Sequence, residues 1–274
     1  EEQWSSLTSE ENTTQNMMNH ATQGTYPPGS TFKLITLLEY IRENPDTWQD
    51  FHYTCTGTYT NGDYVVNCHD GVAHGELDIY GILGMSCNGA FDTIAQTLNS
   101  TKWQKRAEDF GYNQSDRSQV DFPYKKSHFD IASDDSVWSR MQLAIGQGTT
   151  TVTPLLNLMM YAAIANDGVM MTPYLVDHYL DADGNVVEQT KPKALRSVCT
   201  KAEAELMDEF LTYVITNGTA AAGGSQYARV SGKTGSAQYD STKNYHAWLC
   251  GYGTNDVSEI AVCALIEKGG AGGI

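Results

Sequence analysis

The chain has 274 residues, of which 41% are hydrophobic, so it is long enough for one large domain or two subdomains with a sizeable core. Its 33 acidic and 17 basic side chains give a formal charge of −16, which argues against nucleic acid or an anionic membrane surface as a direct partner. No stretch approaches the ~18–20 consecutive apolar residues of a membrane span. Because both ends are abrupt, we expect the chain to be a piece of a longer protein.

The first segment that carries chemistry follows a polar stretch and runs from Tyr26 to Lys33. Two prolines and Gly29 in this segment form the entry turn of a helix predicted from Ser30 to about Arg42. Residues three apart on a helix share a face, so Ser30 and Lys33 can touch. A serine hydroxyl becomes a nucleophile when a nearby base takes its proton, and a lysine becomes that base when burial or a second cation lowers its pKa. The ordinary alternative is a serine cap followed by a solvated lysine.

The middle of the chain predicts short strands and then helices. The residue pattern alternates over residues 51–67, which predicts two short strands with a turn at Asn61-Gly62. Residues 76–85 and 91–110 are typical of helices. Ser86-Cys87-Asn88 falls in the loop between these two helices, because glycines bracket it.

The second half predicts helices that lead into an antiparallel sheet. Thr153 and Pro154 are typical of a helix start, and Gly168 of its end. Residues 181–185 form a hairpin turn, and residues 201–216 form an amphipathic helix. Short turns join the last three predicted strands, which are residues 229–239, 246–254 and 260–267.

Six cysteines show no regular spacing. Cys55 with Cys68, and Cys250 with Cys263, could each form a disulfide in an oxidising compartment, although free buried cysteine is the default expectation. No C-x-x-C pair or close ladder of cysteine and histidine occurs, so we expect no metal site.

Three motifs occur in the order that marks penicillin-binding proteins and class A β-lactamases: S-x-x-K, S-x-N and K-T-G. In this chain they are Ser30 to Lys33, Ser86-Cys87-Asn88 and Lys233-Thr234-Gly235-Ser236. From about residue 4 to residue 274 the chain resembles the transpeptidase domain of a penicillin-binding protein, most closely the class B type. Four further segments carry the same resemblance: residues 19–24, 144–154, 216–220 and 246–248.

The resemblance implies an α/β (α+β) fold, in which an antiparallel sheet subdomain with flanking helices packs against an all-helical subdomain. The helical subdomain would span about residues 43–165, and the sheet subdomain about residues 1–42 and 166–274. The family sheet has further strands upstream and a helix downstream of these residues, so we expect one open sheet edge here.

The resemblance also implies a role for each motif residue. Ser30 would be the acylated nucleophile and Lys33 its base, with Ser86 passing the proton on to the leaving amine. Asn88 would orient Lys33 and hold the substrate amide. Lys233 would supply positive charge, while Thr234, Gly235 and Ser236 would bind the substrate. No cofactor or metal is implied, and Cys87 and His74 are expected to be structural.

By resemblance, the reaction is D,D-transpeptidation, which cross-links peptidoglycan stem peptides of lipid II-derived glycan strands through an acyl-serine at D-Ala-D-Ala. β-Lactam antibiotics would acylate and inhibit the same serine, a membrane glycan polymerase would be a partner, and the location would be the extracytoplasmic face of a bacterial membrane. Two alternatives stay open: a D,D-carboxypeptidase, and a non-catalytic β-lactam sensor or scaffold. A β-lactamase is disfavoured, because the E-x-x-L-N motif of class A enzymes does not occur between Asn88 and Lys233.

Overall fold

The computed structural model of the protein describes residues 17–114, 120–242 and 244–272. Its α-helices are α2 (His20–Gln23), α3 (Lys33–Glu43), α4 (Ile79–Gly84), α5 (Asn88–Thr97), α6 (Ser100–Asp109), α7 (Val137–Ala144), α8 (Pro154–Ala165) and α9 (Lys201–Asn217). Its strands are β1 (His52–Cys55), β2 (Thr58–Asn61), β3 (Tyr64–Asn67), β4 (Gly75–Asp78), β5 (Val169–Met171), β6 (His178–Leu180), β7 (Val186–Gln189), β8 (Ala194–Ser197), β9 (Arg229–Gln238), β10 (Tyr245–Thr254) and β11 (Glu259–Ile266).

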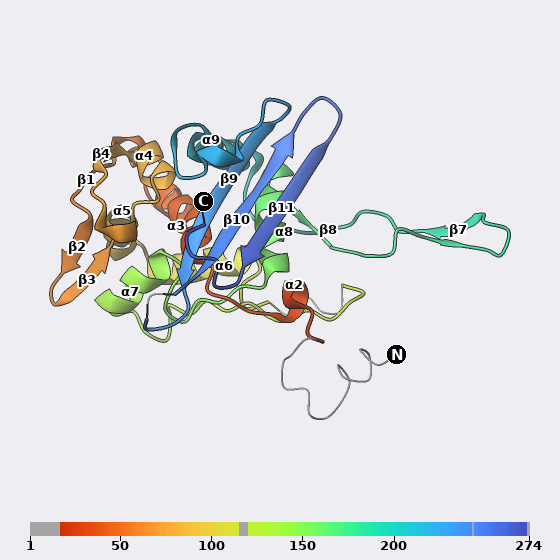
Figure 1. Ribbon diagram of the computed structural model, residues 1–274, viewed down its shortest axis with the longest axis horizontal. Helices are drawn as coiled ribbons and strands as arrows, with labels where there is room; N and C mark the ends of the chain where they lie inside the picture. The colour runs from red at the N-terminus through yellow and green to blue at the C-terminus, as the bar shows by residue number, and fades with distance from the viewer. Residues whose placement is uncertain (1–16, 115–119, 243, 273–274) are drawn as a thin grey trace.

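The main sheet is an antiparallel meander with the order β11-β10-β9, as the sequence predicted. Helices α8 and α9 pack against it, while α3 to α7 and β1 to β4 gather beyond β9 (Figure 1). Within the described part of the chain β11 pairs only with β10 and carries exposed apolar side chains, which agrees with the expected open edge.

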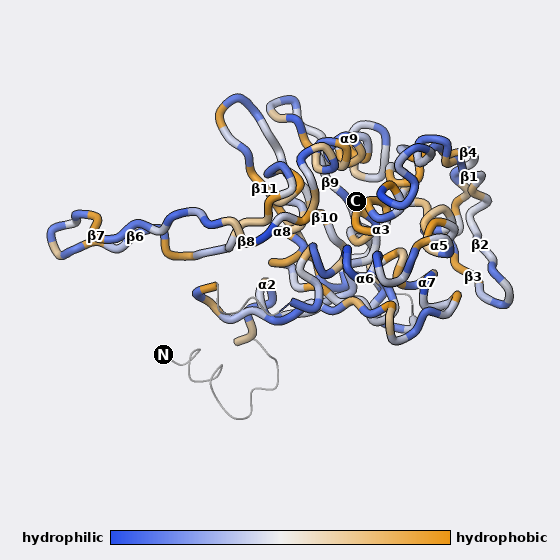
Figure 2. The backbone as a smooth tube through the Cα atoms, turned by 180° about the vertical axis from the view of Figure 1, so that it is seen from behind, coloured by the Kyte–Doolittle hydropathy of each residue, from blue (hydrophilic) through white to orange (hydrophobic). Residues whose placement is uncertain are grey.

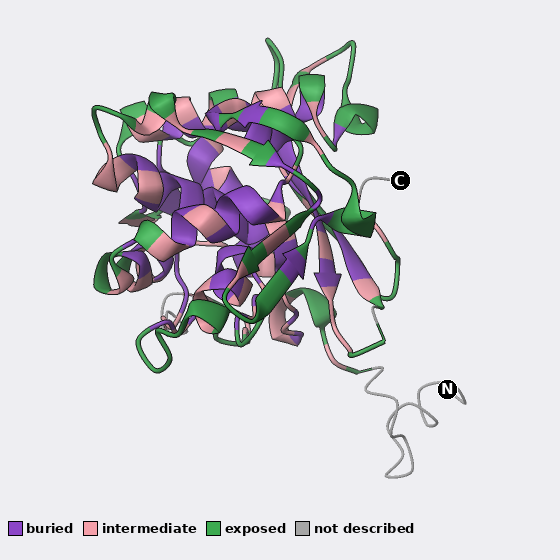
Figure 3. Cartoon of the chain, turned by 90° about the vertical axis from the view of Figure 1, so that its left-hand side faces the viewer, coloured by how far each residue is buried: buried purple, intermediate pink, exposed green. Residues whose placement is uncertain are grey.

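Helix α3 forms the centre of the molecule. Its residues Leu34, Ile35, Leu37 and Leu38 are fully buried, and Figure 3 shows buried helical segments throughout this region. Apolar side chains on nearly every side of a helix require neighbours all round, and α5, α6 and α9 all contact α3. The start of α3, which carries the S-x-x-K motif, is therefore held in a packed interior.

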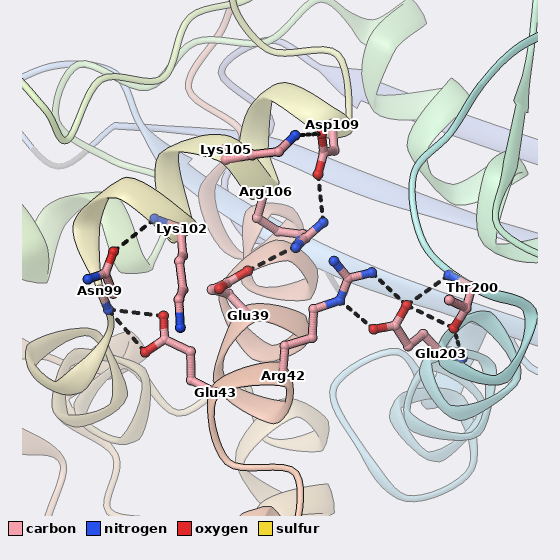
Figure 4. Close-up of polar contacts among 10 residues, drawn as sticks. All are labelled: Glu39, Arg42, Glu43, Asn99, Lys102, Lys105, Arg106, Asp109, Thr200 and Glu203. Carbon is pink, nitrogen blue, oxygen red and sulfur yellow. Dashed lines mark hydrogen bonds and ion pairs between the residues drawn. The ribbon is translucent and has the colours of Figure 1, made fainter.

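Polar contacts fix the far end of α3 (Figure 4). Arg106 of α6 donates from Nε to Glu39 at 3.0 Å, and both side chains are buried. Arg42 forms a two-pronged ion pair with Glu203, which also completes a capping box with Thr200 at the start of α9. These contacts join α3 to α6 and α9.

Two predicted helix boundaries were wrong. The first three residues of the predicted helix 76–85 belong to strand β4, and α4 begins only after Asp78, whose carboxylate accepts from the Gly81 N–H at 2.7 Å. The predicted helix 91–110 is divided into α5 and α6, because Asn99 caps a new helix through the Lys102 N–H at 3.0 Å. In both places a capping side chain interrupts an apparently continuous pattern.

The small strands form two-stranded pairs. β2 and β3 form the predicted hairpin, with the turn at residues 62–63, one position later than expected, because Asn61 pairs with Tyr64. β6 and β7 form a hairpin that extends away from the body (Figure 1), and both strands carry exposed apolar residues beside a polar turn (Figure 2). Residues 43–165 thus contain β1 to β4 as well as helices, and the proposed division into subdomains stays a prediction.

Among the residues that the structure describes, none of the helices combines the length and apolarity that crossing a bilayer requires.

Candidate active site

Ser30 lies on a 3-10 turn (Gly29–Phe32) that leads directly into α3. The Lys33 N–H donates to the Ser30 carbonyl, so the two motif residues are separated by one hydrogen-bonded turn. Gly29 has a φ of 55°, and a Cβ built there would lie 3.1 Å from the Ala237 Cα of β9. Glycine therefore allows the Ser30 turn to approach the sheet closely.

Neighbouring elements hold this turn from several sides. The Trp248 Nε1 of β10 donates to the Pro27 carbonyl at 3.0 Å, and the Gly29 N–H donates to the Gly146 carbonyl at 2.9 Å. From α8, the Tyr161 hydroxyl donates to the Thr31 carbonyl at 3.0 Å. Because buried polar groups normally find partners, these bonds fix the Ser30 backbone at the junction of the sheet and the helices.

The Lys33 side chain is completely buried and reaches the S-x-N loop. Its Nζ donates to the Ser86 carbonyl at 2.7 Å, to the Ser86 Oγ at 3.2 Å and to the Asn88 Oδ1 at 2.7 Å. The ammonium also lies 5.1 Å from the centre of the Phe91 ring. An ammonium group has three N–H donors, and Ser86 and Asn88 of the S-x-N motif accept all three from Lys33.

Burial is the main cause that lowers the pKa of Lys33 to about 8. Burial, and then the nearby Lys33 charge, hold the pKa of Lys233 well below its ordinary value. Lys233 is itself fully buried, and its Nζ donates to the Thr234 carbonyl at 3.1 Å. Two desolvated lysines whose charges repel each other favour a neutral amine on one of them, which a general base requires.

The S-x-N loop lies between α4 and α5, as predicted. Ser86 has a φ of 53°, a left-handed conformation that is uncommon for residues other than glycine. Asn88 donates from Nδ2 to the Asn67 carbonyl at 2.8 Å while its Oδ1 accepts from Lys33. Both ends of the Asn88 amide are therefore committed, and this fixes its orientation.

The K-T-G motif lies on β9, at the sheet edge that faces the helices. A Cβ at Gly235 would lie 3.1 Å from the Pro28 carbonyl, so this strand and the segment that leads into the Ser30 turn are in direct contact. The Thr234 hydroxyl pairs with the Thr219 hydroxyl at 2.9 Å, and the Ser236 Oγ accepts from the Gly272 N–H at 3.0 Å. The structure thus gathers the Ser30 turn, the S-x-N loop and the K-T-G strand at one junction.

Some residues near this site were not singled out from the sequence. Asp92, one turn into α5, is fully buried, and neither carboxylate oxygen has a hydrogen-bond partner among the described residues. Burial raises the pKa of Asp92 well above its usual range. Phe91 and Asn67 belong to the site through the contacts described above, but only the fold reveals them. Thr219 lies in the segment 216–220 that carries the family resemblance, although its contact with Thr234 needed the fold.

The cysteines of the described chain are free thiols. Cys250 and Cys263 are cross-strand partners with sulfurs 3.0 Å apart, and those of Cys55 and Cys68 are 3.6 Å apart. The fold also gathers Cys55, Cys68, His74 and Cys87, whose ligand atoms all lie within 4.8 Å of one another. We expected no metal site because these residues are not closely spaced along the sequence. The fold brings them together, so their spacing no longer argues against a metal site.

The motif order and its convergence at one junction place the chain among penicillin-binding proteins and serine β-lactamases. The chain belongs to the penicillin binding protein transpeptidase domain family, whose family model matches residues 3–274. This confirms the resemblance found in the sequence.

Similar proteins support this family assignment. The peptidoglycan D,D-transpeptidase PbpA of Mycolicibacterium smegmatis is 26% identical over 261 residues, which cover 93% of this chain and 52% of PbpA. The peptidoglycan D,D-transpeptidase MrdA of Acinetobacter baumannii is 26% identical over 287 residues, which cover 96% of this chain and 42% of MrdA. The chain thus spans about half the length of these curated relatives.

Solved structures confirm the predicted fold class. The D,D-transpeptidase domain of a peptidoglycan glycosyltransferase from Eggerthella lenta matches with a TM-score of 0.82 and 28% identity, covering 92% of this chain and 63% of that one. An imipenem acyl-enzyme complex of penicillin-binding protein A from M. tuberculosis matches with a TM-score of 0.86 and 24% identity, covering 99% of this chain and 62% of that one.

Proposed function

We propose that this chain is the catalytic part of a class B penicillin-binding protein, a serine D,D-transpeptidase that cross-links peptidoglycan stem peptides. The observation that carries the proposal is the buried Lys33 amine, which is held by Ser86 and Asn88 next to a second desolvated lysine. Burying a lysine is energetically costly, and a purely structural role does not require it. A general base does, because burial lowers the pKa of the amine. The relatives named D,D-transpeptidases add support.

In the acylation step, the neutral Lys33 amine takes the hydroxyl proton of Ser30, and the Ser30 Oγ attacks the carbonyl carbon between the two D-alanines. The tetrahedral intermediate collapses as its C–N bond breaks. Ser86, whose Oγ lies 3.2 Å from the Lys33 Nζ, passes the proton from Lys33 to the leaving amine. The terminal D-alanine departs, and an acyl ester remains on Ser30.

Backbone N–H groups of Ser30 and Ser236 stabilise the oxyanion of this intermediate. Each oxyanion-hole donor contributes about 10²–10³ in rate in other serine hydrolases. Lys233 supplies positive charge for the terminal carboxylate of the donor peptide, and the Thr234 and Ser236 hydroxyls hydrogen-bond it. Gly235 leaves room for the peptide backbone to lie along β9.

In the second step, the amine of a neighbouring stem peptide attacks the acyl-Ser30 ester. Lys33 takes a proton from this amine and returns one to the Ser30 Oγ, so the serine is regenerated as an amide cross-link forms. A β-lactam mimics D-Ala-D-Ala and leaves a slowly hydrolysed acyl-Ser30. Water as the acceptor would make the enzyme a D,D-carboxypeptidase instead.

We also propose that the chain works at the extracytoplasmic face of a bacterial membrane, beside a membrane glycan polymerase. A peptidoglycan synthase complex that coordinates polymerization and crosslinking contains a chain of the same fold, which matches this one with a TM-score of 0.82 and 24% identity. The shared fold is what supports this part of the proposal. The substrate would be the stem peptides of lipid II-derived glycan strands.

The test is labelling with a fluorescent penicillin, followed on a denaturing gel, with Ser30→Ala and Cys199→Ser in parallel. We expect a stable label on the wild-type chain and on Cys199→Ser, and none on Ser30→Ala. Incubation with a stem pentapeptide and an acceptor amine then separates cross-linked product from simple release of D-alanine. A label lost within seconds would contradict the proposal and indicate a β-lactamase. No label on a folded sample would indicate a non-catalytic scaffold.

A further inference from the structure

Four metal-ligating side chains converge next to the S-x-N loop. They are Cys55 at the end of β1, Cys68 just after β3, His74 just before β4 and Cys87 at the start of α5. The three thiols are almost completely buried, with exposed fractions of 3%, 4% and 0% in chain order, and His74 is half-buried. Three thiols and an imidazole from four separate segments form a three-cysteine, one-histidine set.

Three of the distances within this set are close to the edges of a tetrahedron around one metal ion. Zinc–sulfur bonds of about 2.3 Å and zinc–nitrogen bonds of about 2.0–2.1 Å give tetrahedral sulfur–sulfur edges of about 3.8 Å and sulfur–nitrogen edges of about 3.6 Å. The sulfurs of Cys55 and Cys68 are 3.6 Å apart, and those of Cys68 and Cys87 are 3.8 Å apart. The Cys55 sulfur and the His74 Nδ1 are 3.4 Å apart.

The local backbone is shaped around these thiols. The segment from Cys68 to Gly75 winds tightly, with positive φ angles at Asp70, Gly71 and Gly75, and this brings His74 back to Cys55. The Gly57 N–H points at the Cys55 sulfur at 3.4 Å. Such N–H groups offset the negative charge of metal-bound thiolates.

The start of α5 carries one member of the set, because Cys87 is the N-cap residue of this helix. Tetrahedral sites rich in thiolate select zinc over harder cations, and a closed set of four protein ligands is typical of a structural site.

We propose that Cys55, Cys68, His74 and Cys87 bind one structural Zn²⁺ ion, which ties the β1–β4 segment to the S-x-N loop. Cys87 lies between Ser86 and Asn88, the two residues that hold the Lys33 amine. Asn88 also bonds the carbonyl of Asn67, the neighbour of Cys68. A metal that holds Cys68 and Cys87 together therefore holds the positions from which Ser86 and Asn88 reach Lys33.

The direct test is the metal content of the reduced chain, measured by plasma mass spectrometry after purification without added metal. We expect about one zinc ion per chain. Replacement of zinc by Co²⁺ should give a thiolate-to-metal charge-transfer band and the strong visible bands of a tetrahedral site. A fully reduced, folded chain that holds no zinc, and that gives no tetrahedral cobalt spectrum, would overturn the proposal. A disulfide between Cys55 and Cys68 in the unreduced chain would do the same, because it consumes two ligands.

Single variants distinguish these ligands from other cysteines. Cys68→Ser, Cys87→Ser and His74→Ala should lower zinc affinity by about 10-fold or more. Cys199→Ser and Cys263→Ser are matched controls that should retain the metal, because neither thiol belongs to the cluster. If a ligand variant fails to fold, the cobalt titration of the wild-type apo chain still decides the question. Zinc binding that is equal in ligand and control variants would overturn the assignment.

The second part of the inference, that zinc supports the catalytic loop, rests on the proposed function. Removing zinc with a chelator should lower the rate of acylation by a fluorescent penicillin by about 10-fold or more, and adding zinc back should restore it. A chain that binds zinc yet is never labelled would contradict the proposed function and leave the metal site in place. A chain that is labelled at the same rate with and without zinc would overturn the coupling.

Discussion

Lys33 and Asn88 are joined by a hydrogen bond of 2.7 Å between the lysine Nζ and the amide Oδ1, although 55 positions separate them in the sequence. The other end of the same amide donates to the Asn67 carbonyl at 2.8 Å. An amide held at both ends cannot rotate freely, so it presents its oxygen to the lysine. Asn88 therefore acts on Lys33 through its orientation as well as its polarity.

Replacing Asn88 tests this positioning. We expect Asn88→Ala to lower the second-order rate of β-lactam acylation by about 10²-fold, because Lys33, the proposed general base, loses its alignment. Asn88→Asp should lower it as well, since a carboxylate beside Lys33 favours the charged, non-basic form. Stopped-flow or gel labelling measures the rate, and Asn255→Ala, in the turn after β10, serves as the control. Wild-type rates in both Asn88 variants would show that Asn88 has no part in acylation.

The pKa of Lys33 predicts a pH profile. Burial lowers this pKa to about 8, so most Lys33 side chains are charged at pH 7 and more become neutral as the pH rises. In the proposed mechanism the neutral amine is the base, so the acylation rate should increase with pH through about 8 and then level off. The profile is obtained by measuring the rate of acylation by a neutral β-lactam ester across the pH range in which the protein stays folded. A rate that is flat or that falls with pH would exclude Lys33 as the titrating base.

Much of this site could be predicted from the sequence, because its motifs are short and local. Ser30 and Lys33 are one turn apart, and the K-T-G residues share one strand, so spacing alone places them. The meander was also predictable, since its turns are short.

The remainder depends on long-range contacts that no local pattern encodes. The cluster of Cys55, Cys68, His74 and Cys87 forms only when β1, β4 and α5 pack together, and spacing along the chain argued against it. The division between α5 and α6 was missed because one side chain, Asn99, ends a pattern that otherwise continues. Asp92 could not be distinguished from an exposed helical aspartate until its burial was known.

Ser86 combines a strained backbone with a functional hydroxyl, and two substitutions separate them. Ser86→Gly removes the hydroxyl and relieves the left-handed conformation at φ 53°, whereas Ser86→Ala removes only the hydroxyl. Both variants should be acylated about 10²-fold more slowly, because the proton route to the leaving group is lost. Ser86→Gly should nevertheless be at least as stable as Ser86→Ala in denaturant unfolding. A Gly variant that is acylated at the wild-type rate would show that the hydroxyl is dispensable.

At the other end of α3, Glu39 and Arg106 form an ion pair with an N–O distance of 3.0 Å, and Glu39 is 2% exposed. Burial is the main cause that raises the pKa of Glu39, and Arg106 opposes it. Arg106 also contacts Asp109 at 2.7 Å (Figure 4), so its guanidinium bridges two carboxylates. Removing one partner leaves a buried charge without compensation, which is far costlier than losing an exposed pair.

We therefore expect Arg106→Met to lower the free energy of unfolding by about 3–5 kcal/mol, and Glu39→Met to lower it by a similar amount. The double variant Glu39→Met with Arg106→Met should lose much less than the sum of the two, because it leaves neither charge behind. Lys105→Ala, which breaks the exposed pair with Asp109 on the same helix, is the matched control and should cost less than about 1 kcal/mol. Urea unfolding followed by tryptophan fluorescence measures all four. Strictly additive losses in the double variant would show that Glu39 and Arg106 stabilise α3 separately, and not as a pair.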